Sequence, residues 1–165
     1  MSFRNLIVAI VLAAAPLFFS AGLFAEEAKP LPPQAHADNP MNQIGAETSS
    51  GTHKWIIDLA SDQPSRSRGL MFVNAMPQNR GMLFRFDQQE VVAMWMKNTF
   101  IPLDMIFMTE SGEISYIHRG AVPHSRAIIS SRVPARYVLE LNAGEAARAG
   151  LKAGQKMRHP WFKVR

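Results

Sequence analysis

Three polar residues lie in or shortly after a strongly apolar run of the sequence. Lys97, Asp104 and His118 lie within or shortly after the run WMKNTFIPLDMIF. If residues 99–102 form a four-residue hairpin loop, Lys97 lies opposite Asp104 on the neighbouring strand. The short loop ESG that follows then places Asp104 opposite His118. The sequence therefore predicts one row of Lys97, Asp104 and His118 across three strands.

Such a row could serve structure or binding. Buried charges must be paired, so a structural row is an ion-pair and hydrogen-bond network at the end of a strand layer. Trp95, Ile106 and Tyr116 form the adjacent row on the same face, because side chains alternate along a strand. The binding alternative is a cationic cleft lined by aromatic rings. Its candidate ligand-binding residues are Trp95, Lys97, Asp104, Tyr116 and His118.

A small hydrolase is the enzymatic alternative. An Asp beside a His is the orienting half of a catalytic triad, so Asp104 and His118 could activate a hydroxyl nucleophile. The loop GAVPHSRAIISSRVP offers Ser125, Ser130 and Ser131. None of these serines lies in a nucleophile-elbow pattern such as GxSxG. We therefore assign no catalytic residue and favour a binding role over an enzyme.

The opposite face of the same predicted hairpin is rich in methionine. It carries Met94, Met96 and Met105, with Met105 opposite Met96. Thioethers can bind Cu(I), so a copper-binding periplasmic protein is a further alternative. Methionine is also a common gap-filler in apolar cores, and no histidine falls on this face. We therefore predict core packing at these positions and no metal or cofactor.

The motif RGLM supplies one more candidate ligand-binding residue, Arg68. An arginine at the end of a short helix can place its guanidinium against a carboxylate. Glu140 and Asp104 are the candidate partners. The alternative is an exposed arginine on a polar helix face.

Strands must position these residues. Apolar runs predict them at residues 52–60, 81–86, 90–98, 103–109, 113–119 and 136–142, with a closing strand at 155–164. The run VVAMWM indicates a central strand with both faces covered. One helix is expected to start at Ser61-Asp62, and a capping box of Asn142 and Glu145 predicts a second. Together they predict a mainly β fold, a single compact β-sandwich or barrel-like domain with about two short helices.

Longer motifs resemble a known family. The segments RGLMF, GMLFRF, WMKNTFIPLDMIF, SGEI and PARYVLELNAG follow one another between about residues 66 and 157. They resemble the DUF192 (UPF0127) family of small, often exported domains that have no established biochemical function. The resemblance implies a compact mainly β domain and supplies no catalytic residue. Met94 stands where the resemblance leads us to expect a large aromatic residue, so a copper site there would be particular to this chain.

The N-terminus has the layout of a secretory signal. Arg4 precedes an apolar stretch, and small residues and an acidic segment follow. We expect residues 1–25 to be a signal peptide, residues 26–50 a disordered spacer rich in Pro, Ala and Ser, and residues 51–165 the β domain. The alternative is an uncleaved segment that anchors the protein in the inner membrane.

The amino-acid composition excludes several kinds of chemistry and one class of partner. The 165 residues include no cysteine and give a net charge of +5. Disulfides, a lipid-modified cysteine and thiol catalysis are therefore excluded. The arginines are scattered singly and not clustered with stacking aromatics, so no nucleic-acid partner is expected. We predict an exported protein that is soluble in the periplasm and acts as a binding or interaction module for an unknown envelope ligand or protein. It would contact the membrane only through the N-terminal segment, if that segment is not cleaved.

Overall fold

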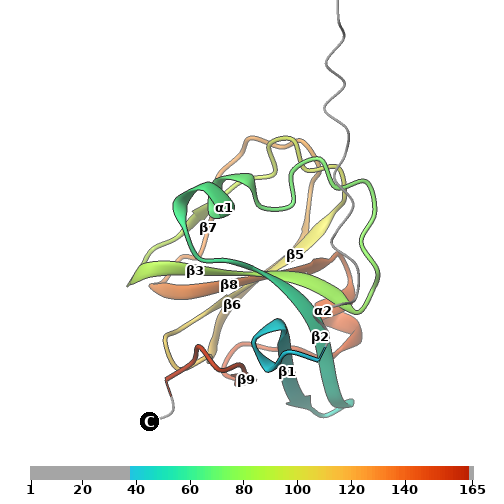
Figure 1. Cartoon of the computed structure of the whole chain (residues 1–165), viewed down its shortest axis with the longest axis vertical. Coiled ribbons are helices and arrows are strands. Elements are labelled where there is room, and N and C mark those ends of the chain that lie inside the picture. The colour runs from blue at the N-terminus through green and yellow to red at the C-terminus, as the bar shows by residue number, and fades with distance from the viewer. Residues whose placement is uncertain (1–37, 164–165) are drawn as a thin grey trace, which may run out of the picture.

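The structure is a computed structural model that describes residues 38–163 (Figure 1). Helix is confined to short segments and strands predominate, so the predicted mainly β class is confirmed. The elements in chain order are η2 (Pro40–Asn42), β1 (Gln43–Thr48), β2 (Gly51–Ala60), α1 (Gln63–Arg68), β3 (Arg80–Glu90), β4 (Ala93–Met94), β5 (Leu103–Met108), β6 (Ile114–Ala121), β7 (Ile129–Ser130), β8 (Ala135–Asn142), α2 (Glu145–Arg148) and β9 (Met157–Arg158).

Seven strands form one curled sheet in the order β6-β5-β8-β3-β2-β1-β9, which gives the domain the shape of a half-barrel (Figure 1). Strands β4 and β7 form a separate two-stranded sheet. Neighbouring strands are antiparallel except for β2 and β3. The predicted barrel-like domain with two short helices is therefore confirmed for the described residues. No helix in this part of the chain has the length and apolar character needed to cross a membrane.

The parallel strands β2 and β3 require a crossover connection, and α1 lies in it. Asp62 starts the helix as predicted, because its carboxylate accepts a hydrogen bond from the backbone N–H of Ser65 at 2.8 Å. The guanidinium of Arg66 then donates to the backbone oxygens of Ser61 and Arg85, each at 3.0 Å. These bonds fix α1 against β3, on the side of the sheet where β7 also lies (Figure 1).

Apolar side chains pack against both faces of the large sheet. Leu103, Met105 and Phe107 of β5 join one cluster. Ile106 and Met108, which alternate with them, join the other. All residues of β5 are buried. Strand β5 and its neighbour β8 are therefore central strands that are covered on both faces.

The expectation of a central strand at residues 90–98 is wrong. Only Ala93–Met94 form a strand there, the short β4 of the small sheet. The side chains of Val91 and Trp95 are 57% and 49% exposed. A short apolar run cannot by its pattern alone be distinguished from a surface segment that covers a core, which is what this segment does.

The ordered domain begins earlier than the sequence indicates. Strand β1 lies inside the segment expected to be a disordered spacer, and its Ile44 and Ala46 are buried. The spacer prediction is therefore wrong for residues 43–48. The predicted signal peptide, residues 1–25, lies outside the described residues, as does the first part of the spacer. The closing strand expected at residues 155–164 is reduced to β9, which pairs with β1.

Candidate functional site

The predicted pairing of Asp104 with His118 is wrong because of a β-bulge. The loop itself forms as expected, with the N–H of Thr109 donating to the oxygen of Glu113 at 2.9 Å. One residue further on, the register shifts, so that Met105 and not Asp104 lies opposite His118. The extra residue on β6 is Ser115, whose hydroxyl donates to the backbone oxygen of Phe107 at 3.1 Å.

The row that includes His118 therefore has other members. Met82 of β3 pairs with Glu140 of β8, and Glu140 pairs in turn with Met105 of β5. Directly paired residues share a face of the sheet, so this row runs Met82, Glu140, Met105, His118. Lys97 is not in a strand; it is exposed in a turn and does not lie opposite Asp104. The predicted row of Lys97, Asp104 and His118 does not exist.

Asp104 has a structural role instead. Its side chain is fully buried, at 0% exposure. One carboxylate oxygen accepts the N–H of Gly120 at 2.9 Å. The other accepts the N–H groups of Gly144 and Ala146, each at 3.0 Å, where α2 begins. Asp104 thus caps α2 and ties it to β6. It has no surface with which to contact a ligand.

The predicted capping box of Asn142 and Glu145 is also wrong, because Asn142 is not the N-cap of α2. Residue 142 ends β8, and its side-chain amide donates to the backbone oxygen of Met76 at 2.9 Å. The N-cap of α2 is Gly144, which has no side chain to cap the helix. Asp104 supplies the missing acceptor from a strand distant in sequence.

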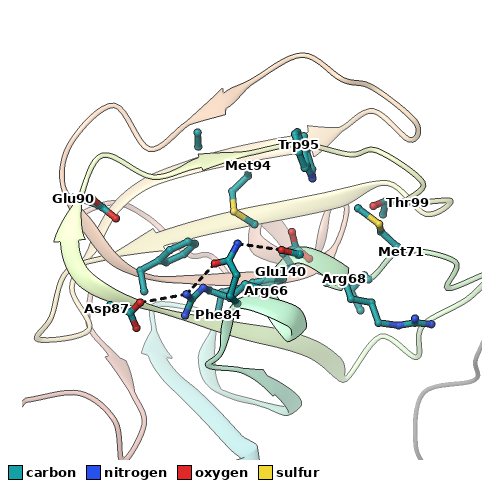
Figure 2. Close-up of a pocket in the computed structure, with 16 residues that line it drawn as sticks. Arg66, Arg68, Met71, Phe84, Asp87, Glu90, Met94, Trp95, Thr99 and Glu140 are labelled. Atoms are coloured by element: carbon teal, nitrogen blue, oxygen red, sulfur yellow. Dashed lines mark hydrogen bonds and ion pairs between the residues drawn. The ribbon is translucent and has the colours of Figure 1, made fainter.

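A pocket of about 360 Å³ opens on the face of the sheet that α1 covers. It lies between α1, the second half of β3 and the segment 93–99, and β8 contributes to its floor. In Figure 2, Trp95 and Met94 lie across the pocket from Arg66 and Arg68, with Glu140 between them. The side chains that matter below are Met71, Phe84, Met94, Trp95, Thr99 and Glu140.

Glu140 is the unusual member of this set, which we call the Glu140 pocket. It is only 4% exposed. Its row neighbours on both sides are methionines, Met82 and Met105. Within residues 38–163 its carboxyl has neither a hydrogen-bond partner nor an ion-pair partner. Burial raises the pKa of Glu140 to about 8. At neutral pH the group is therefore mainly a neutral carboxylic acid, which is what an unpaired acid in low dielectric becomes.

Arg68 lies at the rim of this pocket but does not pair with Glu140. The residue is exposed, and its guanidinium points away from Glu140 in Figure 2. The expected pair with Asp104 is not formed either, because all three contacts of that carboxylate are with backbone N–H groups. Of the two arginines that line the pocket, Arg66, which the sequence did not single out, lies beside a carboxylate: its Nη2 is 3.4 Å from Oδ2 of Asp87.

The other predicted ligand-binding residues lie apart from the pocket. The ring of Tyr116 stacks on Phe107 at 5.8 Å between centroids, and the guanidinium of Arg132 lies 4.4 Å above the Tyr116 ring. His118 is half-buried on β6. Neither residue lines the Glu140 pocket, and neither does Lys97. Of the ligand-binding and metal-ligating candidates named from the sequence, Arg68, Trp95 and Met94 meet there, together with Glu140, which was named only as a partner for Arg68.

The methionines divide between core and pocket. Met96 and Met105 are both fully buried in one apolar cluster, so the prediction of core packing is confirmed for them. Met94 is half-buried and lines the pocket, as Met71 does. No group of three or more His, Cys, Asp or Glu side chains within the described range could hold a metal ion.

The loop serines do not complete a catalytic site. Ser131 is buried, and its hydroxyl donates to the backbone oxygen of Val133 at 2.7 Å while accepting the N–H of Val92 at 2.9 Å. Its role is to join two surface segments. Because Asp104 is not beside His118, the orienting pair that the hydrolase hypothesis requires is also missing.

Comparisons with known proteins agree with this mainly β domain. Two crystal structures are similar to the chain. One, from Sinorhizobium meliloti 1021 and described as a "putative transcription regulator", is 46% identical, with a TM-score of 0.70 over 73% of this chain and 94% of that one. The other, a protein of unknown function from Novosphingobium aromaticivorans DSM 12444, is 34% identical, with a TM-score of 0.68 over 70% of this chain and 83% of that one.

Curated proteins offer no match to the sequence. A family model does match, over residues 45–159, and that family carries the description "Uncharacterized ACR". The match spans both central strands, α1 and every residue of the Glu140 pocket. The chain belongs to the DUF192 family.

Proposed function

We propose that this protein is a non-enzymatic binding module that takes a small molecule into the Glu140 pocket. The observation that carries the proposal is the buried carboxyl of Glu140, which has no partner within residues 38–163 and forms part of the pocket lining. A buried polar group without a partner costs free energy. Such groups are concentrated at functional sites, where a ligand supplies the missing partner.

The remainder of the lining suits a small ligand. A volume of about 360 Å³ lies within the usual range for ligand pockets. Phe84, Met71 and Met94 supply apolar surface, and Thr99 supplies a hydroxyl. Trp95 is half-exposed at the mouth, where a ligand would cover it. Half of the sixteen lining residues are polar or charged, so the pocket suits a small organic molecule that carries both apolar and polar groups.

A binding role explains this pocket more simply than catalysis. General acid–base chemistry commonly needs a second group, either a base or a nucleophile, within hydrogen-bond reach of the first. The Glu140 carboxyl has no such neighbour among the described residues. The half-exposed Trp95 and the unpaired acid are both explained if the ligand binds and is released unchanged.

Export belongs to the same proposal. It is supported by the basic, apolar and small-residue layout of the first 25 residues. N-terminal sequencing of the mature protein from an envelope fraction tests it. We expect the mature chain to start near Glu26 in the soluble fraction. Intact Met1 in the membrane pellet would support the alternative of an inner-membrane anchor.

Cu(I) binding is a second candidate, because the thioethers of Met71 and Met94 both line the Glu140 pocket. Titration against a Cu(I) competitor tests it. If copper binds there, Met94→Leu should abolish binding with little loss of stability, since Leu and Met are close in volume. Affinity no higher than that of a methionine-poor control protein would remove this candidate.

The description of the Sinorhizobium relative refers to that protein, and we do not propose DNA binding for this one. Several arginines are engaged in ion pairs and are not displayed as a basic surface. Arg66 pairs with Asp87, Arg80 with Asp58 and Arg148 with Glu145. A nucleic-acid site would need clustered free cations with stacking aromatics.

Two-dimensional NMR with a fragment library tests the proposed site without knowledge of the ligand. The library should contain cationic, neutral and anionic members. We expect shift changes to concentrate at residues 68–71, residues 93–99 and Glu140. Fragments that bind only elsewhere, or no binding by any fragment, would contradict the assignment of this pocket. Tyr116 and His118 on the outer strand β6 serve as internal controls that should not respond.

A further inference from the structure

The charged groups around the Glu140 pocket are not balanced. Its lining includes two guanidinium groups, those of Arg66 and Arg68, and three carboxyl groups, those of Asp87, Glu90 and Glu140. Arg66 is already held by Asp87 and by two backbone oxygens. The guanidinium of Arg68 points away from Glu140 (Figure 2). When Glu140 ionises, no cation of the lining therefore compensates it.

The walls near Glu140 suit a positive charge of low hydration. Trp95 and Phe84 present aromatic rings, and aromatic faces attract ammonium groups. Met71 and Met94 add polarizable thioethers. A strongly hydrated ion would lose its water here for few polar contacts. An organic cation, with its charge surrounded by carbon, would lose less and would gain contacts with these walls.

We infer that the ligand of the Glu140 pocket is a small organic cation, an amine or a quaternary ammonium compound, whose positive centre pairs with the Glu140 carboxylate and lies against Trp95. The inference rests on the proposed binding function and narrows it to one class of ligand. It accounts for both the missing countercharge on the floor of the pocket and the half-exposed indole at its mouth.

Binding of such a cation is linked to loss of a proton. Because burial raises the pKa of Glu140 to about 8, the carboxyl must ionise when the cation enters, and its proton goes to solvent. The other charged groups that face the pocket come from two elements: Arg66 and Arg68 from α1, and Asp87 and Glu90 from β3. The pocket residues of segment 93–99 and β8 add no titratable group besides Glu140.

A matched pair of probes tests the inference. Choline carries a permanent positive charge, and 3,3-dimethylbutan-1-ol replaces its nitrogen by carbon at nearly the same shape. At pH 9 we expect calorimetry to show choline binding at least about tenfold more tightly than the alcohol, as expected for a desolvated ion pair with an aromatic contact. The anion 3,3-dimethylbutanoate should bind more weakly than either.

Variants assign the effect to named residues. In Glu140→Gln the affinity for choline should fall to that for the alcohol, while the affinity for the alcohol should stay the same. Trp95→Leu keeps an apolar side chain at a half-exposed position and removes the aromatic face. It should weaken choline several-fold and leave the alcohol nearly unchanged. Thermal melts of both variants confirm that each is folded.

The proton provides an independent readout. Choline does not titrate, so any dependence of its affinity on pH belongs to the protein. Below the pKa of Glu140 the affinity should rise by roughly tenfold per pH unit, because only the ionised carboxylate pairs with the cation. Heats measured at pH 7 in buffers of different ionisation enthalpy should give about one proton released per choline bound. Glu140→Gln should release none.

The outcomes separate this inference from the proposed function. Equal or tighter binding of the alcohol or the anion in the pocket overturns the cation inference and leaves the binding function standing. Choline affinity that is unchanged in Glu140→Gln also overturns the inference. If none of the three probes reaches the pocket at millimolar concentration, both the inference and the proposed function are contradicted.

Discussion

Two buried carboxyl groups lie on adjacent central strands and have opposite surroundings. Asp104 of β5 pairs with Leu141, so it is one register position from Glu140 of β8 and faces the other side of the sheet. Asp104 accepts hydrogen bonds from three backbone N–H groups. The Glu140 carboxyl has no partner in the described part of the chain, and a pocket opens above it.

The difference between the two residues separates structure from function. The fold surrounds Asp104 with the donors that a buried carboxylate needs, and so joins α2 to β6. It places Glu140 among methionines and an open volume, where no donor compensates its burial. A protein retains an uncompensated group of this kind where function requires it. Stability should therefore depend strongly on Asp104, whereas Glu140 should lower stability as it ionises.

The largest expected effect is at Asp104. Asp104→Ala leaves the N–H groups of Gly120, Gly144 and the buried Ala146 without their acceptor. We expect the free energy of unfolding to fall by about 3–5 kcal/mol, measured by urea denaturation at pH 7. A loss below about 1 kcal/mol, the range for exposed polar contacts, would show that the capping bonds do not stabilise the fold.

Lys97 supplies the control for this prediction. Because Lys97 is exposed in a turn, Lys97→Met should change stability by less than about 0.5 kcal/mol. Adding Lys97→Met to Asp104→Leu should not restore the stability that Asp104→Leu loses. Substantial recovery in the double variant would mean that the two residues form the ion pair first expected from the sequence.

The next effect in size is the pH dependence that Glu140 imposes. Its pKa is raised from the ordinary value of 4.5 to about 8, so the folded state holds a proton that the unfolded chain releases. The stabilising contribution of the protonated form is complete below about pH 4.5 and is lost as the pH rises through about 8. Between these values it should fall by about 1.4 kcal/mol per pH unit, on the order of 5 kcal/mol in total.

Glu140→Gln is the matched control, because glutamine is similar in shape and does not ionise. Unfolding free energies of the two proteins at pH 5, 6, 7 and 8 should diverge steadily, with the variant the more stable at the alkaline end. Parallel curves would mean that Glu140 ionises at its ordinary pKa, and the contrast with Asp104 would then disappear.

The smallest expected effect on stability is at the mouth of the pocket. Trp95 is half-exposed, so Trp95→Leu should change the free energy of unfolding by less than about 1 kcal/mol. Melts at pH 7 measure it. A loss of several kcal/mol would assign Trp95 to the core and remove it from the ligand-binding surface. Together with the choline affinity of this variant, the melt shows whether Trp95 contributes to ligand binding without contributing to the stability of the fold.

Much of the fold could be predicted from the sequence, because strands buried on one or both faces leave clear apolar patterns. Strands β2, β3, β5, β6 and β8 and the Asp62 cap of α1 were identified in this way. The register of β5 against β6 was not predicted correctly. A single extra residue, Ser115, moves Met105 into the place predicted for Asp104, and no local pattern marks that bulge.

The site was harder to predict because its members are distant in sequence. Arg68, Trp95 and Met94 were candidates for separate reasons, and the crossover through α1 brings them to one pocket. Glu140 was considered only as a partner for Arg68. A lone acid within the apolar strand RYVLELN was the available signal, but the pattern does not show whether such an acid meets a donor, a cation or an open pocket.

The central claim is that the fold leaves the Glu140 carboxyl without a partner, in a pocket that a ligand completes. Its most direct test is a ¹³C NMR titration of the glutamate side-chain carboxyls, with the Glu140 signal assigned by its loss in Glu140→Gln. We expect this carboxyl to titrate near pH 8 in the free protein. A midpoint near 4.5, the ordinary value for glutamate, would reveal a solvated or paired carboxylate and contradict the claim.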